Sequence, residues 1–298
     1  MSHSTIGTST RTVPVARSRG ELAKALAGLR AGPGGQRRSV ALVPTMGALH
    51  EGHRALMRSA AELADVVVVS IFVNPLQFGA NEHLDRYPRT ETADLDACAA
   101  EGVGLVFAPT PDVVYPTDPT VTVRAGALGE QYEGASRPGH FDGVLTVVAK
   151  LFNLAAPDLA VFGEKDYQQL ALIRQMVHDL DVPVHVVGAP TVREGDGLAL
   201  SSRNRYLSPD ERDAALAISR ALTAGAMAAT PTDVMTTAQA VMDAEPRLRL
   251  DYLRLVDAES LEVVGTSFSG AARLLIAAYA GTTRLIDNIA VNLGTHAG

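Results

Sequence analysis

The feature of this sequence that most constrains its fold is an alternation of short apolar runs with longer amphipathic stretches. The apolar runs are rich in β-branched residues, and the most apolar of them is Val66-Val-Val-Val-Ser-Ile-Phe-Val73. Such runs are typical of strands that are buried on both faces, and a helix between successive strands is the connection that a parallel sheet needs. We therefore predict an α/β fold in which helices cover both faces of a parallel sheet.

The predicted elements of this sheet fill the chain up to about residue 187. The capping-box pattern Ser18-Arg-Gly-Glu21 opens a first helix, and Gly32-Pro-Gly-Gly35 ends it. The further expected helices span about 53–64, 91–100, 141–155 and 167–179, and the expected strands span 40–44, 66–73, 105–107, 159–162 and 184–187.

The pattern changes after Pro190. Ser208-Pro-Asp-Glu211 combines an N-cap, a proline at the first helical position and a capping-box glutamate, and so starts a long alanine-rich helix. A second helix at about 233–244 precedes three strand-like segments at 252–256, 273–278 and 285–291, the last two of which a hairpin joins. We expect two domains, 1–190 with the parallel sheet and 191–298 with a smaller α+β fold, and a hinge at Gly188-Ala-Pro190.

Composition supports an ordinary globular protein. The 298 residues are 47% hydrophobic and 20% charged, and the formal net charge is −7, so no global basic field attracts nucleic acid or an anionic membrane. No apolar run approaches the roughly 20 residues that span a bilayer, and residues 1–11 lack the apolar block of a signal peptide. We expect a cytoplasmic protein with a frayed N-terminus, and we expect the single cysteine, Cys98, to be buried.

The first apolar strand leads into Pro44-Thr-Met-Gly-Ala-Leu-His-Glu-Gly-His53. Ligands gather at the carboxyl ends of parallel strands, and a helix that starts there offers free N–H groups to phosphate. His50 and His53 lie three apart at the helix start, so both can donate to phosphate oxygens. Gly47 and Gly52 would let the backbone approach the ligand. The segment therefore predicts an anion-binding cradle.

Two other interpretations of the histidine pair remain open. The pair could bind zinc, although the metalloprotease spacing is i, i+4 and no third ligand is nearby, or it could be purely structural. The sequence contains no G-x-x-x-x-G-K-[ST] and no G-x-G-x-x-G after a strand, which excludes P-loop and dinucleotide-binding motifs. A histidine type of nucleotide site is left.

Two further clusters suit phosphate. Lys165 and Asp166 follow the strand at 159–162, where Lys165 can meet a phosphate and Asp166 can bind a ribose hydroxyl. The alternatives are a surface role for Lys165 and helix capping by Asp166. The segment Leu198-Ala-Leu-Ser-Ser-Arg-Asn-Arg205 places two hydroxyls beside two guanidinium groups, which suits a loop that closes over a triphosphate, although such a loop can also be simply solvated.

Amide side chains form a fourth cluster. Asn74 and Gln77 follow the strand at 66–73, and Gln169 belongs to the cluster of Lys165. Amides at strand ends can bind a small ligand that carries hydroxyl and carboxylate groups.

At these residues the sequence resembles the pantothenate synthetases, the ATP-dependent pantoate–β-alanine ligases. The resemblance extends from the first strand to the C-terminal hairpin and rests on six ordered motifs: PTMGALHEGH (44–53), FVNPLQF (72–78), YPRT (87–90), RPGHFDGV (137–144), FGEKDYQQ (162–169) and LALSSRNRYL (198–207). It implies a Rossmann-like nucleotidylyltransferase domain, a smaller α+β C-terminal lid domain and a homodimer. It also implies that pantoate and ATP form pantoyl adenylate, from which β-alanine displaces AMP.

The resemblance also implies roles for individual residues. His50, His53 and Lys165 would be catalytic, and Gln77, Gln169 and Asn74 would hold pantoate or β-alanine. The implied ATP site comprises Pro44, Met46, Gly47, His50, His53, Gly163, Lys165, Asp166, Val192, Leu200, Ser201, Ser202 and Arg203, where Leu200 replaces the usual methionine.

Mg²⁺ would accompany ATP. Acidic residues after YPRT are implicated in metal binding in such families, but Ala93 stands here where a second carboxylate is common. Asp94 is therefore a metal candidate, with a favourable charge at a helix start as the alternative.

Other functions stay under consideration at this point. Another nucleotidylyltransferase would use the same cradle for a phosphate-bearing acceptor, which should need extra Arg or Lys in the acceptor pocket. A non-catalytic ATP sensor would bind ATP without turnover. Arg137 and His140 either touch substrate or cap the helix that begins near Phe141.

Overall fold

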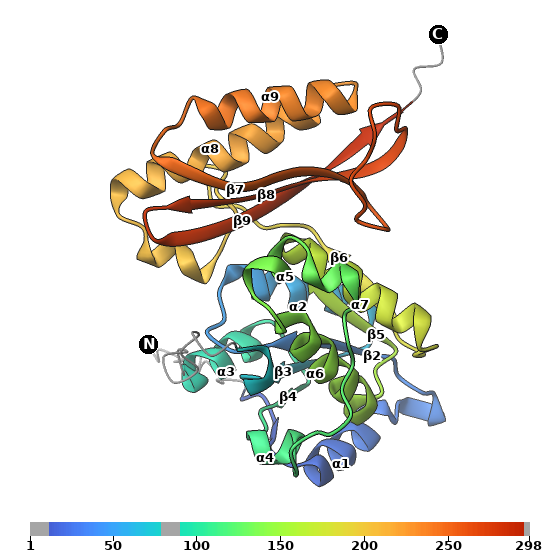
Figure 1. The fold of residues 1–298 in the computed structure, drawn as a ribbon. Helices are drawn as coiled ribbons and strands as arrows, with labels where there is room; N and C mark the ends of the chain where they lie inside the picture. The colour runs from blue at the N-terminus through green and yellow to red at the C-terminus, as the bar shows by residue number, and fades with distance from the viewer. Residues whose placement is uncertain (1–11, 79–89, 295–298) are drawn as a thin grey trace, which may run out of the picture.

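The computed structural model describes residues 12–78 and 90–294, and within them it contains two sheets that lie one above the other (Figure 1). The expected N-terminal tail and most of YPRT lie outside the described residues. The first sheet has six parallel strands in the order β1-β4-β3-β2-β5-β6. Its strands are β1 (Val15–Ala16), β2 (Val40–Thr45), β3 (Val66–Ile71), β4 (Leu105–Phe107), β5 (Leu159–Gly163) and β6 (His185–Ala189).

Successive strand residues point to opposite sides of this sheet. Because the residues on both sides are apolar, helices cover both faces. Val40 and Leu42 pack with α1 (Arg19–Arg30), α6 (His140–Ala155) and α7 (Tyr167–Asp179). Ala41 and Val43 pack with α2 (Glu51–Leu63) and α3 (Glu91–Ala100). The predicted α/β class is confirmed, and so is the burial of Cys98, which is 0% exposed on α3.

The structure differs from the sequence prediction in several details. The edge strand β1 was not predicted, because two residues show no periodicity. Helix α2 begins at Glu51 rather than His53, because His50 itself caps the helix. Two short helices, α4 (Pro111–Val114) and α5 (Glu133–Ser136), interrupt the connection from β4 to α6.

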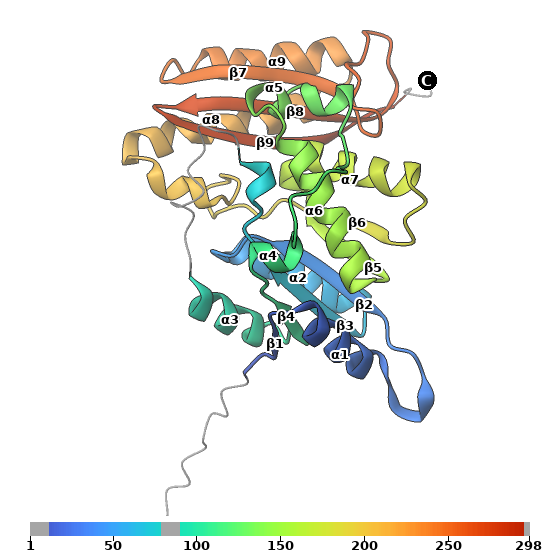
Figure 2. The ribbon, with the colours of Figure 1, turned by 60° about the horizontal axis from the view of Figure 1, so that its bottom comes forward.

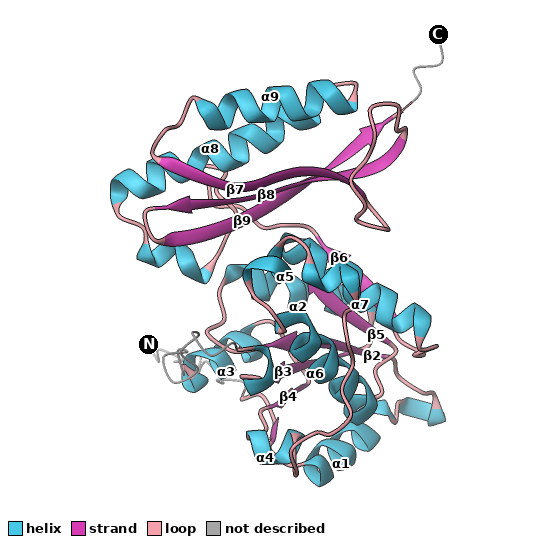
Figure 3. Cartoon of the chain, in the orientation of Figure 1, coloured by secondary structure: helices cyan, strands magenta, loops and turns pink. Residues whose placement is uncertain are grey.

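The second sheet is antiparallel and has the order β7-β8-β9. It comprises β7 (Leu248–Asp257), β8 (Gly270–Ala280) and β9 (Thr283–Leu293), and the predicted hairpin joins β8 to β9. Helices α8 (Pro209–Ala226) and α9 (Pro231–Asp243) lie on its outer face (Figure 3). Alanines of α8 such as Ala214, Ala217 and Ala221 are 0% exposed, so their small side chains let the helix pack closely on the strands.

The inner face of this sheet rests on the first part of the chain. Leu275 of β8 and Val256 of β7 belong to the same apolar cluster as α6 and α7. Figure 1 shows α5 beneath the C-terminal sheet, and in the turned view of Figure 2 it lies in front of that sheet. Glu133 of α5 binds Tyr252 of β7 and Arg284 of β9. In the part of the chain that the structure describes, no helix is long and apolar enough to cross a membrane.

Candidate active site

The histidine pair forms a reciprocal cap at the start of α2. The Gly52 N–H donates to Nδ1 of His50 (3.1 Å), and the His50 N–H donates to Nδ1 of His53 (3.3 Å). Both Nδ1 atoms are therefore acceptors, and each neutral ring carries its proton on Nε2. The two rings lie 4.1 Å apart between centroids. The pair thus has a structural role at Nδ1 and retains one N–H donor per ring at Nε2.

The pKa values of both histidines lie below the ordinary value of 6.5, which favours the neutral rings. Burial lowers the pKa of His53 to about 4, and the neighbouring His50 adds to this effect. Burial also lowers the pKa of His50, and the charge of Lys165 acts in the same direction. Among the described residues, no group of three or more His, Cys, Asp or Glu side chains could hold a metal ion, so nothing here supports the zinc interpretation.

We expect the free energy of unfolding to fall as the pH is lowered from 6.5 through the pKa of His53. The folded pKa of about 4 lies below the ordinary value of 6.5, so between these values the unfolded chain binds a proton that the folded chain does not. The stabilisation is complete above pH 6.5 and is lost as the pH falls through the folded pKa. An NMR titration of His53 should show a midpoint near pH 4, and urea unfolding of His53→Gln should depend less on pH over this range. A midpoint near 6.5 would contradict the burial of this ring.

The loop between β2 and α2 is held in a strained conformation. Gly47 and Ala48 have φ values of 82° and 50°, and a Cβ at Gly47 would lie 3.0 Å from the Asp94 carboxylate. A Cβ at Gly52 would lie 2.9 Å from the His50 ring and 3.5 Å from Leu200. Gly52 therefore makes room for the His50 ring, and the approach of its backbone to a ligand stays a prediction.

Asp94 anchors this loop. Its side-chain oxygens accept from the backbone N–H groups of Ala48 (3.0 Å) and Leu49 (2.8 Å) and from the Thr90 hydroxyl (3.1 Å). Asp94 is 3% exposed. These hydrogen bonds stabilise the buried carboxylate of Asp94 without a metal ion.

Asp94→Asn should loosen the loop. The amide turns one acceptor into a donor that faces a backbone N–H, so we expect a loss of about 1–3 kcal/mol in unfolding free energy. The exposed Asp96→Asn on the same helix is the matched control. Urea unfolding measures the loss in both variants. Equal losses in the two variants would contradict the anchoring role of Asp94.

The amide cluster is partly structural. Asn74 is 1% exposed, accepts from the Tyr115 hydroxyl (2.9 Å), and donates to Gln77 Oε1 (3.2 Å) and to the Gly143 carbonyl (3.0 Å). Nε2 of Gln77 lies 2.9 Å from the sulfur of Met46, so Gln77 adjoins the predicted nucleotide loop. Asn74 therefore orients Gln77, and among the described residues its own amide is occupied.

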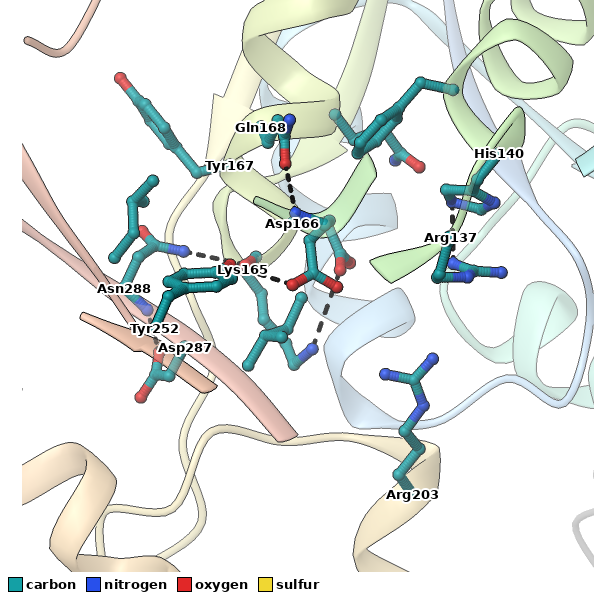
Figure 4. Close-up of a pocket in the computed structure, with 15 residues that line it drawn as sticks. Arg137, His140, Lys165, Asp166, Tyr167, Gln168, Arg203, Tyr252, Asp287 and Asn288 are labelled. Carbon is teal, nitrogen blue, oxygen red and sulfur yellow. Dashed lines mark hydrogen bonds and ion pairs between the residues drawn. The ribbon is translucent and has the colours of Figure 1, made fainter. Parts of the chain in front are cut away.

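Lys165 and Asp166 line a cavity between the two sheets, with about 520 Å³ of empty space (Figure 4). Their side chains lie 3.9 Å apart between Nζ and Oδ1. The Asp166 side chain is 54% exposed, and the nearby charges of Lys165 and Arg203 lower its pKa below its ordinary value. Asp166 makes no capping bond to α7, so the capping alternative is not observed.

Arg137 and His140 face the same cavity. Nδ1 of His140 lies 2.9 Å from the Gln77 carbonyl, and Nη1 of Arg137 lies 2.9 Å from Nε2 of His140. The carbonyl accepts the Nδ1 proton, so Nε2 accepts from the guanidinium. Helix α6 has no side-chain cap, which favours the cavity-facing role of the pair over the capping one.

The predicted phosphate loop is tied together by its own bonds. The Leu200 N–H donates to the Val192 carbonyl (2.9 Å), and the Ser201 hydroxyl accepts from the Arg203 N–H (3.2 Å). Figure 4 shows the Arg203 side chain pointing from this loop toward the cavity. Ser202 is exposed.

The structure thus brings one group of predicted residues into the cavity and places the rest around it. Lys165, Asp166, Gln169 and Arg203 line the cavity. The charge of Asp166 acts to raise the pKa of both histidines, so the pair lies near the cavity. Pro44 and Gly163 lie at the carboxyl ends of β2 and β5. The cavity also has lining residues that the sequence analysis missed: Glu133, Tyr252, Asp287 and Asn288. Two adjacent polar residues inside the apolar strand 285–291 were the available signal for the last two.

Comparison with known proteins shows the family to which the chain is similar. A sequence model of the family described as pantoate-beta-alanine ligase matches residues 15–290. The pantothenate synthetase of Nocardia farcinica is 59% identical over 92% of this chain and 84% of its own, and that of Salinispora arenicola is 57% identical over 93% and 99%.

Solved structures agree as well. The crystal structure of pantothenate synthetase from Thermus thermophilus superposes with a TM-score of 0.84 at 44% identity, covering 93% of this chain and 99% of that one. Pantoate-beta-alanine ligase from Francisella tularensis, crystallised with beta-gamma ATP and β-alanine, gives a TM-score of 0.73 at 31% identity, covering 93% and 97%.

Proposed function

The chain belongs to the pantoate-beta-alanine ligase family, and from this premise we propose that it condenses (R)-pantoate with β-alanine at the cavity between its two sheets. The pantoate carboxylate attacks the α-phosphorus of ATP, and the bond to pyrophosphate breaks. The β-alanine amine then attacks the acyl carbon of pantoyl adenylate, the bond to AMP breaks, and the amine loses a proton. Pantothenate, AMP and pyrophosphate are the products.

The observation that carries this proposal is the set of donors at the carboxyl ends of β2 and β5. His50 and His53 each retain an Nε2–H, and Lys165 adds a cation near enough to His50 to lower its pKa. A carboxylate is already a nucleophile, so the first step needs no general base. It needs donors aimed at the charge that builds on the α-phosphate and on the departing pyrophosphate, which this set supplies.

The remaining predicted residues take roles around these donors. Arg203, Ser201 and Ser202 would bind the outer phosphates, with Leu200 closing the loop on α2. Asp166, Gly163 and Val192 would hold the nucleoside, and Pro44, Met46 and Gly47 would line its site. Gln77 and Gln169 would bind pantoate, with Asn74 acting through Gln77.

Mg²⁺ would enter with ATP, whose phosphate oxygens are its preferred ligands. The resemblance that suggested Mg²⁺ also suggests a homodimer, and the cytoplasmic location expected from the sequence stays a proposal. Residues 191–298 would act as the lid over residues 1–190, and a closed lid would keep water from the adenylate. Sedimentation at several concentrations would test the dimer.

The rival functions have less support. A phosphate-bearing acceptor would need added cations around Asn74 and Gln77, and the contacts there are instead an amide, a tyrosine hydroxyl and a thioether. A non-catalytic sensor would have no need of so many donors. Product analysis separates all three proposals: AMP and pantothenate should appear in equal amounts and only when both pantoate and β-alanine are present. Transfer of AMP to a phosphorylated acceptor with release of pyrophosphate and no free AMP, or no turnover with any acceptor, would overturn the assignment.

A further inference from the structure

Two adjacent residues of β9, Asp287 and Asn288, contact both segments that carry the proposed phosphate-binding groups. They are 4% and 3% exposed, although they interrupt an apolar strand. Neighbouring strand residues point to opposite faces of a sheet. Asn288 accordingly reaches the segment of Lys165, and Asp287 reaches the loop that leads to Ser201.

Asn288 holds the backbone of the Lys165 segment. Its Nδ2 donates to the carbonyls of Glu164 (2.9 Å) and Lys165 (2.8 Å), as Figure 4 indicates for Lys165. Its Oδ1 accepts from Nε of Arg273 (2.7 Å). Both amide protons and the carbonyl oxygen therefore have partners, and only an amide offers two donors and an acceptor in this shape.

Arg273 fixes the orientation of Asn288. Besides its bond to Asn288, it forms an ion pair with Glu164 (2.6 Å), and its guanidinium lies 4.0 Å above the Tyr167 ring. The hydroxyl of Tyr167 donates to the Ala258 carbonyl (2.9 Å). The residue before Lys165 and the residue after Asp166 are thus both bound to the C-terminal part of the chain.

Asp287 holds the second segment. Its carboxylate accepts two bonds from Arg193, at 2.6 Å and 3.1 Å, and Arg193 also donates to the Gly197 carbonyl (3.1 Å). The planar fork of arginine makes such a paired contact directional. A hydrogen bond from the Leu200 N–H to the Val192 carbonyl closes a loop that contains Arg193. Ser201 follows directly after this loop.

We propose that Asp287 and Asn288 form a clamp that sets the position of Lys165 relative to Ser201–Arg203. The inference rests on the proposed function, because it concerns the assembly of that same ATP site. Neither residue is assigned a contact with substrate, so both are positioning residues. The C-terminal sheet is then a part of the phosphate-binding site as well as a cover, and docking of this sheet and assembly of the site are one event.

The test uses Asn288→Ala and Asn288→Asp, with the exposed Asn292→Asp on the same strand as the matched control. Misplacement of a catalytic group by about 1 Å can cost about 10²-fold in rate. We expect both Asn288 variants to lower pantoate-dependent ATP–pyrophosphate exchange by about tenfold or more. Reaction of supplied pantoyl adenylate with β-alanine should stay within about threefold of the parent protein. Equal losses in both half-reactions would indicate general damage and overturn the proposal.

A double-mutant cycle tests whether Asn288 acts through Lys165. In a Lys165→Ala background, Asn288→Ala should cause little further loss, because the group that it positions is gone. Losses that multiply would overturn the proposal. If Asn288→Asp does not fold, Asn288→Ala gives the result alone. Absence of exchange in the parent protein would contradict the proposed function rather than the clamp, so the two failures are distinguishable.

Discussion

Replacing Lys165 with alanine is expected to lower the rate of pantoate-dependent ATP–pyrophosphate exchange by about 10²–10³-fold, the usual cost of one preorganised donor. Lys165 follows β5, and its side chain is 20% exposed inside the cavity. A fixed cation there stabilises the charge that develops on the phosphates at no cost of solvent reorganisation. The fold should remain, because the bonds to Glu164 and Lys165 from Asn288 involve backbone carbonyls only.

The matched control is Lys24→Ala, which removes an exposed lysine from α1. Its exchange rate should equal that of the parent protein. Thermal unfolding and circular dichroism check that both variants are folded. A folded Lys165→Ala protein with exchange within threefold of the parent would contradict the role of this lysine.

Replacing Arg284 with methionine is expected to lower the free energy of unfolding by about 3–5 kcal/mol, the usual cost of removing one partner of a buried ion pair. Arg284 is 13% exposed and donates to Glu133 (2.7 Å) and to Asp251 (2.8 Å). The other oxygen of Glu133 accepts from the Tyr252 hydroxyl (2.9 Å). Without the guanidinium, the carboxylate of Glu133 stays buried with no cation.

Urea unfolding measures this loss, and Arg17→Met provides the control. Arg17 also pairs with a carboxylate, that of Glu91, but the two side chains are 55% and 52% exposed. An exposed pair of this kind contributes at most about 1 kcal/mol. Because Glu133 on α5 and Arg284 on β9 join the N-terminal part of the chain to the C-terminal sheet, Arg284→Met should also separate the unfolding of these two parts into two transitions. Equal losses in the two variants would show that the contact does not hold the sheets together.

Most of the fold follows from local pattern. The strands of the parallel sheet are apolar on both faces, so their composition alone marked them, and Ser18 and Ser208 start their helices with the predicted capping boxes. The two-residue strand β1 had no such signal, because it forms only by pairing with β4. Local sequence therefore predicted elements with enough residues to show a period.

The site was less accessible to sequence reasoning, because its decisive contacts join distant residues. The bond from Asn288 to the Lys165 carbonyl spans 123 positions. The sequence could not show that the His50 ring lies over Gly52, or that the Tyr115 hydroxyl donates to the Asn74 oxygen. The spacing of three residues between His50 and His53 suits phosphate binding and also suits the reciprocal cap. The sequence could not show that the Nδ1 atoms cap the helix while the Nε2–H groups remain available as donors.

The most direct test of the central claim is ATP–pyrophosphate exchange measured with labelled pyrophosphate in the absence of β-alanine. If pantoyl adenylate forms first, label should enter ATP when pantoate is present and should stay out when pantoate is omitted. Exchange that requires β-alanine, or that proceeds without pantoate, would contradict the acyl-adenylate mechanism and with it the roles assigned to His50, His53 and Lys165.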